Sequence, residues 1–386
     1  RALAAFDPGQ PWEVIPHLLD GLRATRQAAA MAASAPGARS LIEMKERQFE
    51  RAIVAALAVQ VTAVAGAPGL DGHAVVPGER VPVQLTVSID APTAVTLGDV
   101  RLAHHQATAT DSVAANVALL PGEPWRATLS LDVSNGAEPN RPAFVRDGIA
   151  SNHYRWRSGS PDVSARPLSA ARVALTIAVH GVPIEVERSV RIRESREPEG
   201  TAFPRLVVVP PVSLQAQPAV QVVTRTGAVT APVTVEVTGF REAPVSAEVS
   251  LRPRVGSTNS LPASGAGAVA PQTVRLSRGE RRALTFQVAL PDGKDSLTLE
   301  AVARVDGREW RDAVTPIIQR ELEPAYLYTT PTATVRRVAV SMPRGLSVAY
   351  VMGVGDLVPD AIAQLGARVT RLDASTVAAG DFARFD

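Results

Sequence analysis

The chain has 386 residues, which is enough for two or three domains that each bury a core. Its 40 basic and 38 acidic residues leave a formal net charge of +2, so nothing points to nucleic acid or a membrane surface as a partner. It contains no cysteine, which excludes disulfides, thiolate zinc sites and a cysteine nucleophile.

Residues 1–57 are predicted to form two amphipathic helices. The first carries an apolar stripe at helical spacing, formed by Ile15, Leu18, Leu19 and Leu22. The second is predicted to begin at Ser40, which forms a capping box with Glu43, and Glu43 is expected to pair with Arg47. We interpret this segment as the tail of an upstream domain. Its helices are expected to pack either on that domain or on the sandwich that follows.

From about residue 58 the apolar period changes to two, as in half-buried antiparallel strands. The clearest run of alternating apolar residues is Val81, Val83, Leu85, Val87 and Ile89. Short strands of this kind, separated by Pro and Gly, predict a mainly β chain built from Ig-like β-sandwiches. The uncharged run 52–70 contains Gln60, Gly66 and Pro68, so we interpret it as a helix end that continues into a strand, not as a membrane span.

The same strand plan recurs later in the chain. "PVQLTV" at 82–87 returns as "PVTVEV" at 232–237, and "GEPWRATLSLDV" from Gly122 returns as "GERRALTFQVAL" from Gly279. The hairpin signal His180-Gly181 likewise has a counterpart in Asp306-Gly307, a strong type I′ turn pair. The repeat predicts two tandem Ig-like modules, at residues 58–200 and 201–322.

The first module carries an insertion. From Gly122 to Gly181 there are 59 residues, against 28 between Gly279 and Gly307, which leaves 31 extra residues at about 137–167. The insertion concentrates aromatic and arginine side chains, which suit stacking on sugar rings and hydrogen bonding to carboxylates, phosphates or hydroxyls. The candidate ligand-binding residues are Arg146, His153, Tyr154, Arg155, Trp156 and Arg157.

We expect the insertion to be ordered against the first module or the N-terminal helices. Strand alternation would place Tyr154 and Trp156 on one face, and Arg155 and Arg157 on the other. Two arrangements remain open. The rings either point inward as plugs that stabilise the loop, or point outward into a cleft as a platform for a glycan.

Residues 323–386 are predicted to hold a linker strand and the first βαβ unit of an α/β domain, with a glycine-bearing turn at Gly353-Val354-Gly355-Asp356. We expect this domain to continue past Asp386 and the chain to be cut at both ends. Because a two-stranded unit adds little core, removal of residues 323–386 is expected to leave both sandwiches folded. No histidine spacing typical of a zinc site and no GxSxG elbow occur anywhere in the chain.

The stretches "EPAYLYTTPTATVRRVAV" and "GLSVAYVMGVGDLVPDAIAQLGARVTRLD" resemble the late part of large bacterial PIG-L (LmbE-like) deacetylases. "PWEVIPHLLDGLRATRQ", "EMKERQFERAIVAAL" and "RPLSAARVALTIAVHGVPIEVERSVRIR" are similar to the middle of the same proteins. The resemblance implies that residue 347 onward starts an amidotransferase-like domain. It also implies an upstream catalytic domain that binds zinc through an "HPDD" motif and a later His pair, and that removes acetyl groups from N-acetylglucosamine-type sugars.

Neither of those metal motifs occurs in this chain, so no catalytic residue, metal ligand or cofactor is assigned to it. The leading hypothesis is a non-catalytic accessory and spacer region of an extracytoplasmic deacetylase. Its expected partners are the adjacent catalytic and C-terminal domains and a glycan, with no nucleic acid and no membrane span. The alternative is an Ig-like surface adhesion or spacer protein with no enzymatic parent.

Overall fold

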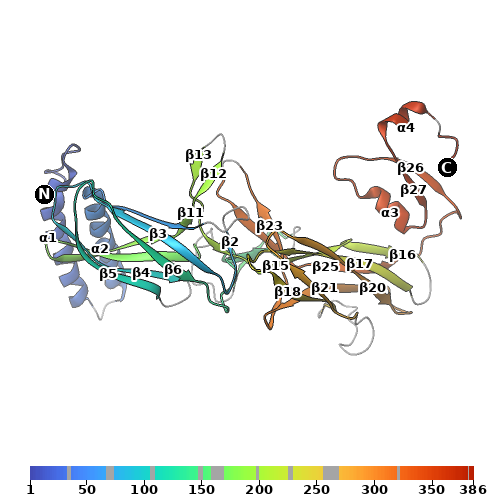
Figure 1. The fold of residues 1–386 in the computed structure, drawn as a ribbon, viewed down its shortest axis with the longest axis horizontal. Coiled ribbons are helices and arrows are strands. Elements are labelled where there is room, and N and C mark those ends of the chain that lie inside the picture. The colour runs from blue at the N-terminus through green and yellow to red at the C-terminus, as the bar shows by residue number, and fades with distance from the viewer. Residues whose placement is uncertain are drawn as a thin grey trace. The chain divides into compact units, whose positions relative to one another are not determined.

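The computed structural model describes residues 1–32, 36–66, 74–104, 109–146, 151–157, 169–196, 200–224, 229–254, 269–319, 322–380 and 382–386. The chain is mainly β, as predicted, and divides into two compact units (Figure 1). The first unit contains Arg1–Val209 and Ile318–Pro324, and the second contains Pro210–Ile317 and Ala325–Asp386.

The N-terminal helices are a short 3-10 turn at Pro11–Val14, α1 at Ile15–Met31 and α2 at Pro36–Ala56. The predicted apolar stripe of α1 is confirmed, since its four residues are all buried. The capping box predicted at Ser40 is wrong, because α2 already begins at Pro36 and Ser40 lies inside the helix. Proline is favoured in a first helical turn. Glu43 pairs with Arg39 one turn before it, at 2.8 Å, and not with the predicted Arg47.

The two helices pack closely on each other and on the sandwich that follows, the second of the two placements considered above. A Cβ at Gly21 would lie 2.4 Å from the ring of Phe49, so the ring of α2 can approach α1 only because position 21 has no side chain. Arg26 of α1 pairs with Glu46 and Glu50 of α2, at 2.7 and 2.9 Å. Buried residues of both helices share one apolar cluster with the strands of the first sandwich.

The first sandwich consists of two four-stranded sheets, in the orders β11-β1-β3-β6 and β10-β9-β4-β5. The first sheet contains β1 (Gln60–Ala65), β3 (Arg80–Ser88), β6 (Trp125–Asp132) and β11 (Arg191–Ile192). The second contains β4 (Val95–His104), β5 (Ala109–Leu119), β9 (Ala171–Val179) and β10 (Val182–Ser189). The predicted alternation in β3 is confirmed: its odd-numbered apolar residues from 81 to 87 are at most 1% exposed.

Three small pairings complete the first unit. β2 (Ala74–Val75) pairs with β14 (Val207–Val208), β12 (Glu194–Arg196) with β13 (Gly200–Ala202), and β7 (Phe144–Arg146) with β8 (Tyr154–Trp156). Because β14 pairs with β2, the first unit extends to Val209 and passes the predicted boundary at residue 200. Glu323 belongs to this unit too, since it accepts a hydrogen bond from the backbone N–H of Arg205 at 2.8 Å.

The second sandwich has one three-stranded and one larger sheet, in the orders β15-β17-β20 and β16-β25-β21-β18-β19, with β22 also paired to β21. The first sheet contains β15 (Val212–Gln217), β17 (Val229–Gly239) and β20 (Arg281–Leu290). The second contains β16 (Val220–Val223), β18 (Val245–Pro253), β19 (Gln272–Leu276), β21 (Ser296–Val305), β22 (Arg308–Trp310) and β25 (Thr332–Arg337). β23 (Ala313–Ile317) and β24 (Ala325–Thr329) form a separate pair.

The predicted internal repeat is visible in this topology. "PVQLTV" lies in β3 and "PVTVEV" in β17, and each strand is paired on both sides, β3 by β1 and β6 and β17 by β15 and β20. The turns between β9 and β10 and between β21 and β22 also match. His180 and Gly181 have φ of 45° and 76°, and Asp306 and Gly307 have φ of 48° and 80°, as a type I′ turn requires.

The expectation that residues 323–386 add little core is wrong. β25 lies between β16 and β21 in the large sheet, and Ala333 and Val335 are fully buried there. The second sandwich therefore extends to Arg337 and does not end at residue 322. Sequence alternation in "TATVRR" is too short to distinguish a core strand from a linker strand.

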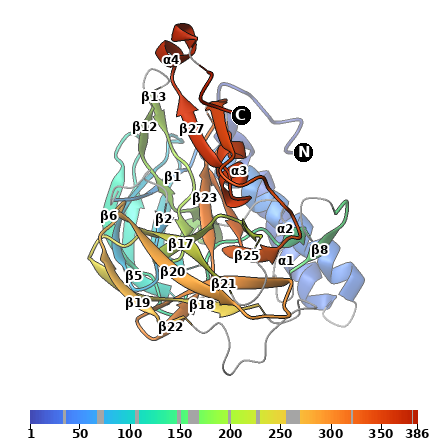
Figure 2. The same ribbon diagram turned by 90° about the vertical axis from the view of Figure 1, so that its right-hand side faces the viewer.

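The C-terminal βαβ unit is confirmed. β26 (Ser347–Val351) pairs in parallel with β27 (Arg368–Leu372), and α3 (Val358–Gln364) connects them. α4 (Ala374–Ala379) follows, and Figure 2 shows α3 and α4 on opposite sides of the strand pair. Gln364 Oε1 accepts a hydrogen bond from the backbone N–H of Val222 at 2.7 Å. In the described part of the chain, no helix has the length and apolar character that a membrane span needs.

An arginine-rich ion-pair network covers the outer face of the large sheet. Glu309 accepts from Arg311 at 2.9 Å and from Arg252 at 2.8 Å, and Arg311 also lies 3.6 Å from Glu300. The hydrogen bonds from Arg311 and Arg252 lower the pKa of Glu309 to about 2. The network holds β22 against β18, two strands that do not pair directly in this sheet.

Replacement of Glu309 by Gln should therefore make the free energy of unfolding less dependent on pH in the acidic range. The pKa of Glu309 is lower in the folded chain than its ordinary value of 4.5, so its contribution is complete above pH 4.5 and is lost as the pH falls toward 2. In urea unfolding, the difference in unfolding free energy between wild type and Glu309→Gln should be largest at pH 7 and shrink between pH 4.5 and 2. A difference that is constant over this range would contradict the network.

Val335→Ala should destabilise the second sandwich by about 2 kcal/mol, because it removes two buried carbons and leaves a cavity. Val340→Ala is the matched control, since Val340 is 41% exposed and lies beyond β25. Deletion of residues 338–386 should leave the sandwich folded, whereas deletion of 323–386 should unfold it because β25 is lost. Urea unfolding of these four variants tests the strand, and equal stability of the two truncated chains would refute it.

Candidate functional site

The described part of the insertion forms a two-stranded antiparallel hairpin. Phe144 lies opposite Trp156, and Arg146 lies opposite Tyr154. Directly opposite residues share a face of a strand pair, and alternate residues of one strand share it too. One face of the hairpin therefore carries these four side chains together, and Arg155 stands on the other face, opposite Val145. We call the four residues Phe144, Arg146, Tyr154 and Trp156 the aromatic face.

Contacts within the aromatic face hold its rings in a fixed arrangement. The centroid of Phe144 lies 5.5 Å from that of Tyr154 and 6.4 Å from that of Trp156, with interplanar angles of 85° and 79°. Edge-to-face pairs of this kind are favourable because the positive ring edge meets the negative ring face. The guanidinium carbon of Arg146 is 5.9 Å from the Tyr154 centroid, and its Nε donates to the carbonyl of Ser151 at 2.5 Å.

The rings of Tyr154 and Trp156 are exposed. Their residues keep 60% and 61% of their accessible surface, while Phe144 on the same face is half-buried. The inward-plug arrangement is therefore wrong for these two rings, because the shared face lies at the surface of the hairpin. Phe144, which was absent from the predicted set, is half-buried and contacts the rings of both Tyr154 and Trp156. The sequence signal that points to Phe144 is its alternation with Arg146 in "FVR", which places the two side chains on one face of a strand.

The hairpin is tied to the first unit at its base. The backbone N–H of Arg157 donates to the carbonyl of Ala143 at 2.7 Å, and Arg157 Nε donates to that of Pro142 at 3.4 Å. Asn140 donates its backbone N–H to the carbonyl of Val208 at 2.9 Å and accepts from the Val208 N–H through Oδ1 at 2.5 Å. The described base is thus ordered against β14. The rest of the predicted insertion, residues 147–150 and 158–167, lies outside the described residues.

The remaining candidate residues have separate places. The backbone N–H of His153 donates to Ser151 Oγ at 3.1 Å, which closes a local turn, and the residue is exposed. The structure thus brings together Arg146, Tyr154 and Trp156 of the predicted set, and it places Arg155 on the opposite face and Arg157 at the base. Among the described residues, no group of three or more His, Cys, Asp or Glu side chains could hold a metal ion.

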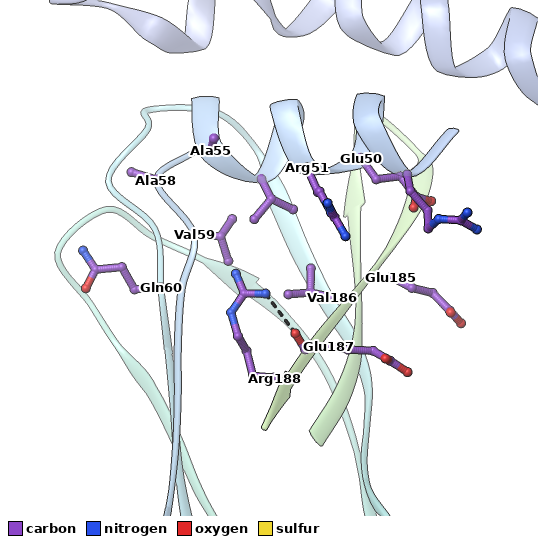
Figure 3. A pocket seen from close by; sticks show the side chains of 12 residues that line it. Glu50, Arg51, Ala55, Ala58, Val59, Gln60, Glu185, Val186, Glu187 and Arg188 are labelled. Carbon is purple, nitrogen blue, oxygen red and sulfur yellow. Dashed lines mark hydrogen bonds between the residues drawn. The ribbon is translucent and has the colours of Figure 1, made fainter. Parts of the chain in front are cut away.

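A groove of about 800 Å³ forms a second feature of the first unit (Figure 3). It lies between the C-terminal half of α2, the start of β1 and the strand β10. Its apolar residues are Val54, Ala55, Ala58, Val59 and Val186, and its charged residues are Arg47, Glu50, Arg51, Glu185, Glu187 and Arg188. Sequence periodicity did not indicate this groove, because its walls come from segments that lie more than 100 residues apart.

Comparisons with known proteins give weak likenesses only. No model of a protein family matches the chain, and no curated protein matches it. A structure of Salmonella alpha-2-macroglobulin reacted with methylamine is 12% identical over 71% of this chain and 16% of its own, with a TM-score of 0.22. Red sea bream transglutaminase is 11% identical over 76% and 34%, with a TM-score of 0.26.

The PapD-like domain 7 of human CEP192 is 9% identical over 34% of this chain and 91% of its own, with a TM-score of 0.20. The chain spans less than a fifth of the alpha-2-macroglobulin chains that it matches. At such TM-scores these likenesses bear on neither the site nor its chemistry.

The double variant Tyr154→Ala/Trp156→Ala should fold with nearly unchanged stability. Both residues are mostly exposed, so truncation removes only their edge contacts with Phe144, worth about 1 kcal/mol or less to the unit as a whole. Two buried plugs would instead have contributed roughly 1.5–3 kcal/mol each. Urea unfolding monitored by circular dichroism distinguishes exposed rings from buried plugs. A decrease of several kcal/mol in the unfolding free energy would contradict the outward arrangement.

Proposed function

We propose that the chain is a non-catalytic accessory region of a multidomain, zinc-dependent N-acetyl-sugar deacetylase of the PIG-L type. In this proposal its two sandwiches space the catalytic domain from the C-terminal α/β domain, and the aromatic face binds a glycan of the substrate. The sequence resemblance supports the parent enzyme. The proposal also places the protein outside the cytoplasm, in the periplasm or secreted, where glycan substrates of this kind are exposed.

The exposed aromatic face is the observation that supports glycan binding. A sugar ring presents an apolar face of C–H groups, which stacks on Tyr154 or Trp156, and equatorial hydroxyls, which accept hydrogen bonds from an arginine. The described contacts hold these rings and Arg146 in place before any ligand arrives. Little side-chain entropy would therefore be lost on binding.

The alternative function is an adhesion or spacer protein without an enzymatic parent. The C-terminal βαβ unit favours the deacetylase, because a stalk made only of sandwiches has no use for an α/β segment. The parent reading frame discriminates the two. An "HPDD" motif in an upstream domain supports the deacetylase, whereas further sandwiches behind a signal peptide support the adhesin.

Titration with N-acetylglucosamine tetramer tests the aromatic face. The wild-type chain should bind the tetramer, and Tyr154→Ala/Trp156→Ala should weaken binding about tenfold or more, since each stacked ring contributes about 0.5–1.5 kcal/mol. Phe6→Ala is the matched control, because Phe6 is an aromatic residue of the same unit that is 53% exposed outside the hairpin. Calorimetric titration that finds no binding to wild type, or equal binding to all three proteins, would refute glycan recognition here.

Residues 1–386 should release no acetate from the same tetramer in the presence of zinc. The reason is that the chain contains neither the "HPDD" motif nor the later His pair that the resemblance places in the upstream domain. A coupled acetate assay measures this directly. Zinc-dependent turnover by the purified chain would contradict the assignment of an accessory role.

A further inference from the structure

Strand β1 has an edge that is paired over part of its length only. On one side it pairs with β3 from Gln60 to Ala65. On the other side its partner in the described part of the chain is β11, which pairs at Val64 and Ala65 alone. The stretch 60–63 therefore presents an open sheet edge, the kind of backbone surface on which a further strand can form.

The hydrogen-bond register shows which backbone groups point outward along this edge. The N–H of Gly66 donates to the carbonyl of Pro82 at 2.7 Å, so position 66 points toward β3. Because this direction alternates along an antiparallel pair, Thr62 and Val64 also point toward β3. Val61 points the other way, with both its N–H and its C=O. The backbone of Val61 is thus available to an added strand.

The open edge borders the groove described above. A second hollow of about 520 Å³, lined by residues 61–64, 187–189, Arg191 and Phe203, shares Glu187 and Arg188 with the first. The two hollows together follow the chain from Ala58 to Val64, which includes most of β1, with β10 on the opposite side. Figure 3 shows Arg51 pointing down from α2 and Arg188 standing between the two strands. An extended chain laid in this space would lie alongside Val61.

The glutamates and the arginines of the groove differ in whether they form ion pairs with other residues. Each glutamate forms an ion pair with an arginine from a neighbouring element. Glu50 pairs at 2.9 Å with Arg26, which it shares with Glu46, while Glu185 pairs with Arg101 at 3.6 Å and Glu187 with Arg172 at 3.7 Å.

The groove arginines lack such partners. Arg188 donates to the backbone carbonyl of Glu187 at 2.9 Å, and no described carboxylate forms an ion pair with Arg47, Arg51 or Arg188. Arg47 and Arg51 are four residues apart on α2 and so lie on one face of it. Among the described residues, these three arginines of the groove thus have no carboxylate partner, and apolar residues line the same groove.

We propose that this groove binds an extended acidic peptide, which adds to the open edge of β1 as a strand and directs its carboxylates to Arg47, Arg51 and Arg188. Main-chain hydrogen bonds to Val61 supply affinity, and the arginines select an acidic sequence over a basic one. The proposal is independent of the glycan-binding hairpin, which lies on other elements of the first unit.

Fluorescence anisotropy with designed peptides tests the charge selection. The probe is a capped, fluorescein-labelled peptide of ten residues that alternates Thr and Glu, and its counterpart alternates Thr and Lys. The acidic peptide should bind at least about tenfold more tightly, because three cations face it. Arg47→Glu/Arg51→Glu should reverse the preference. Arg39→Glu/Lys45→Glu, an equal charge change on the same helix, should leave it unaltered.

Amide hydrogen exchange tests the strand addition separately. The acidic peptide should slow exchange at Val61 and leave Thr62 unchanged, because the Thr62 amide already faces β3. Val61→Pro, which removes the outward N–H at an edge position that tolerates proline, should abolish binding of both peptides. If this variant does not fold, amide exchange at Val61 of the wild-type chain tests the strand addition by itself.

Three results of the peptide experiments would each overturn the proposal. They are equal affinity for the two peptides, unchanged affinity in Arg47→Glu/Arg51→Glu, and no protection of Val61. A second copy of the chain on the same edge would instead appear as a dimer in sedimentation equilibrium that the acidic peptide does not dissociate, and that result would also overturn it.

Discussion

The strands β3 and β17 are the central strands of the two sandwiches, and each buries alternate side chains between the two sheets of its own sandwich. The other elements of each unit pair with these strands or pack on the core that they form. In β3 the buried residues are Val81, Val83, Leu85 and Val87, and in β17 they are Ala231, Val233, Val235 and Val237. A slip of one residue in either strand would turn all four outward and lose roughly 1.5–3 kcal/mol for each buried valine or leucine. Pairing on both sides of the strand makes such a slip more costly still, because two ladders would have to move together.

The N-terminal helices depend on the same core. Leu22 of α1 and Ile53 of α2 belong to the apolar cluster that also contains Leu85 of β3. Since Gly21 lets the ring of Phe49 approach α1, the two helices form one thin layer over the sandwich. The groove then follows from this layer, because α2 ends where β1 begins and its last turns stand above β10. A site of this kind arises from packing between segments that are distant in the sequence.

Several features that rest on local rules could be predicted from the sequence, although the start of α2 could not. The alternation in β3, the stripe of α1 and the hairpin turns at His180-Gly181 and Asp306-Gly307 each involve residues a few positions apart, and the structure contains all of them. The repeat could be recognised because both copies retain the same local signals. The pairing of Tyr154 and Trp156 on one face also follows from alternation alone.

Features decided by long-range pairing could not be predicted. The strand β25 looked like a linker because its core role depends on β16 and β21, which its own six residues do not reveal. Whether Tyr154 and Trp156 face inward or outward depends on how the hairpin packs on the rest of the unit, which alternation within the hairpin does not reveal. The open edge of β1 likewise results from the shortness of β11, a property of its partner.

The chain passes between the two units three times, after Val209, after Ile317 and after Pro324. Neither unit is therefore a continuous segment, and this affects the order in which the protein can fold on the ribosome. The first unit acquires Glu323, with its bond to Arg205, only after the strands β15 to β23 of the second have been synthesised. The second unit in turn acquires β25 only after that segment has emerged. Vectorial synthesis thus completes the first unit at Pro324 and the second sandwich at Arg337, only a few residues apart, although the two cores are separate.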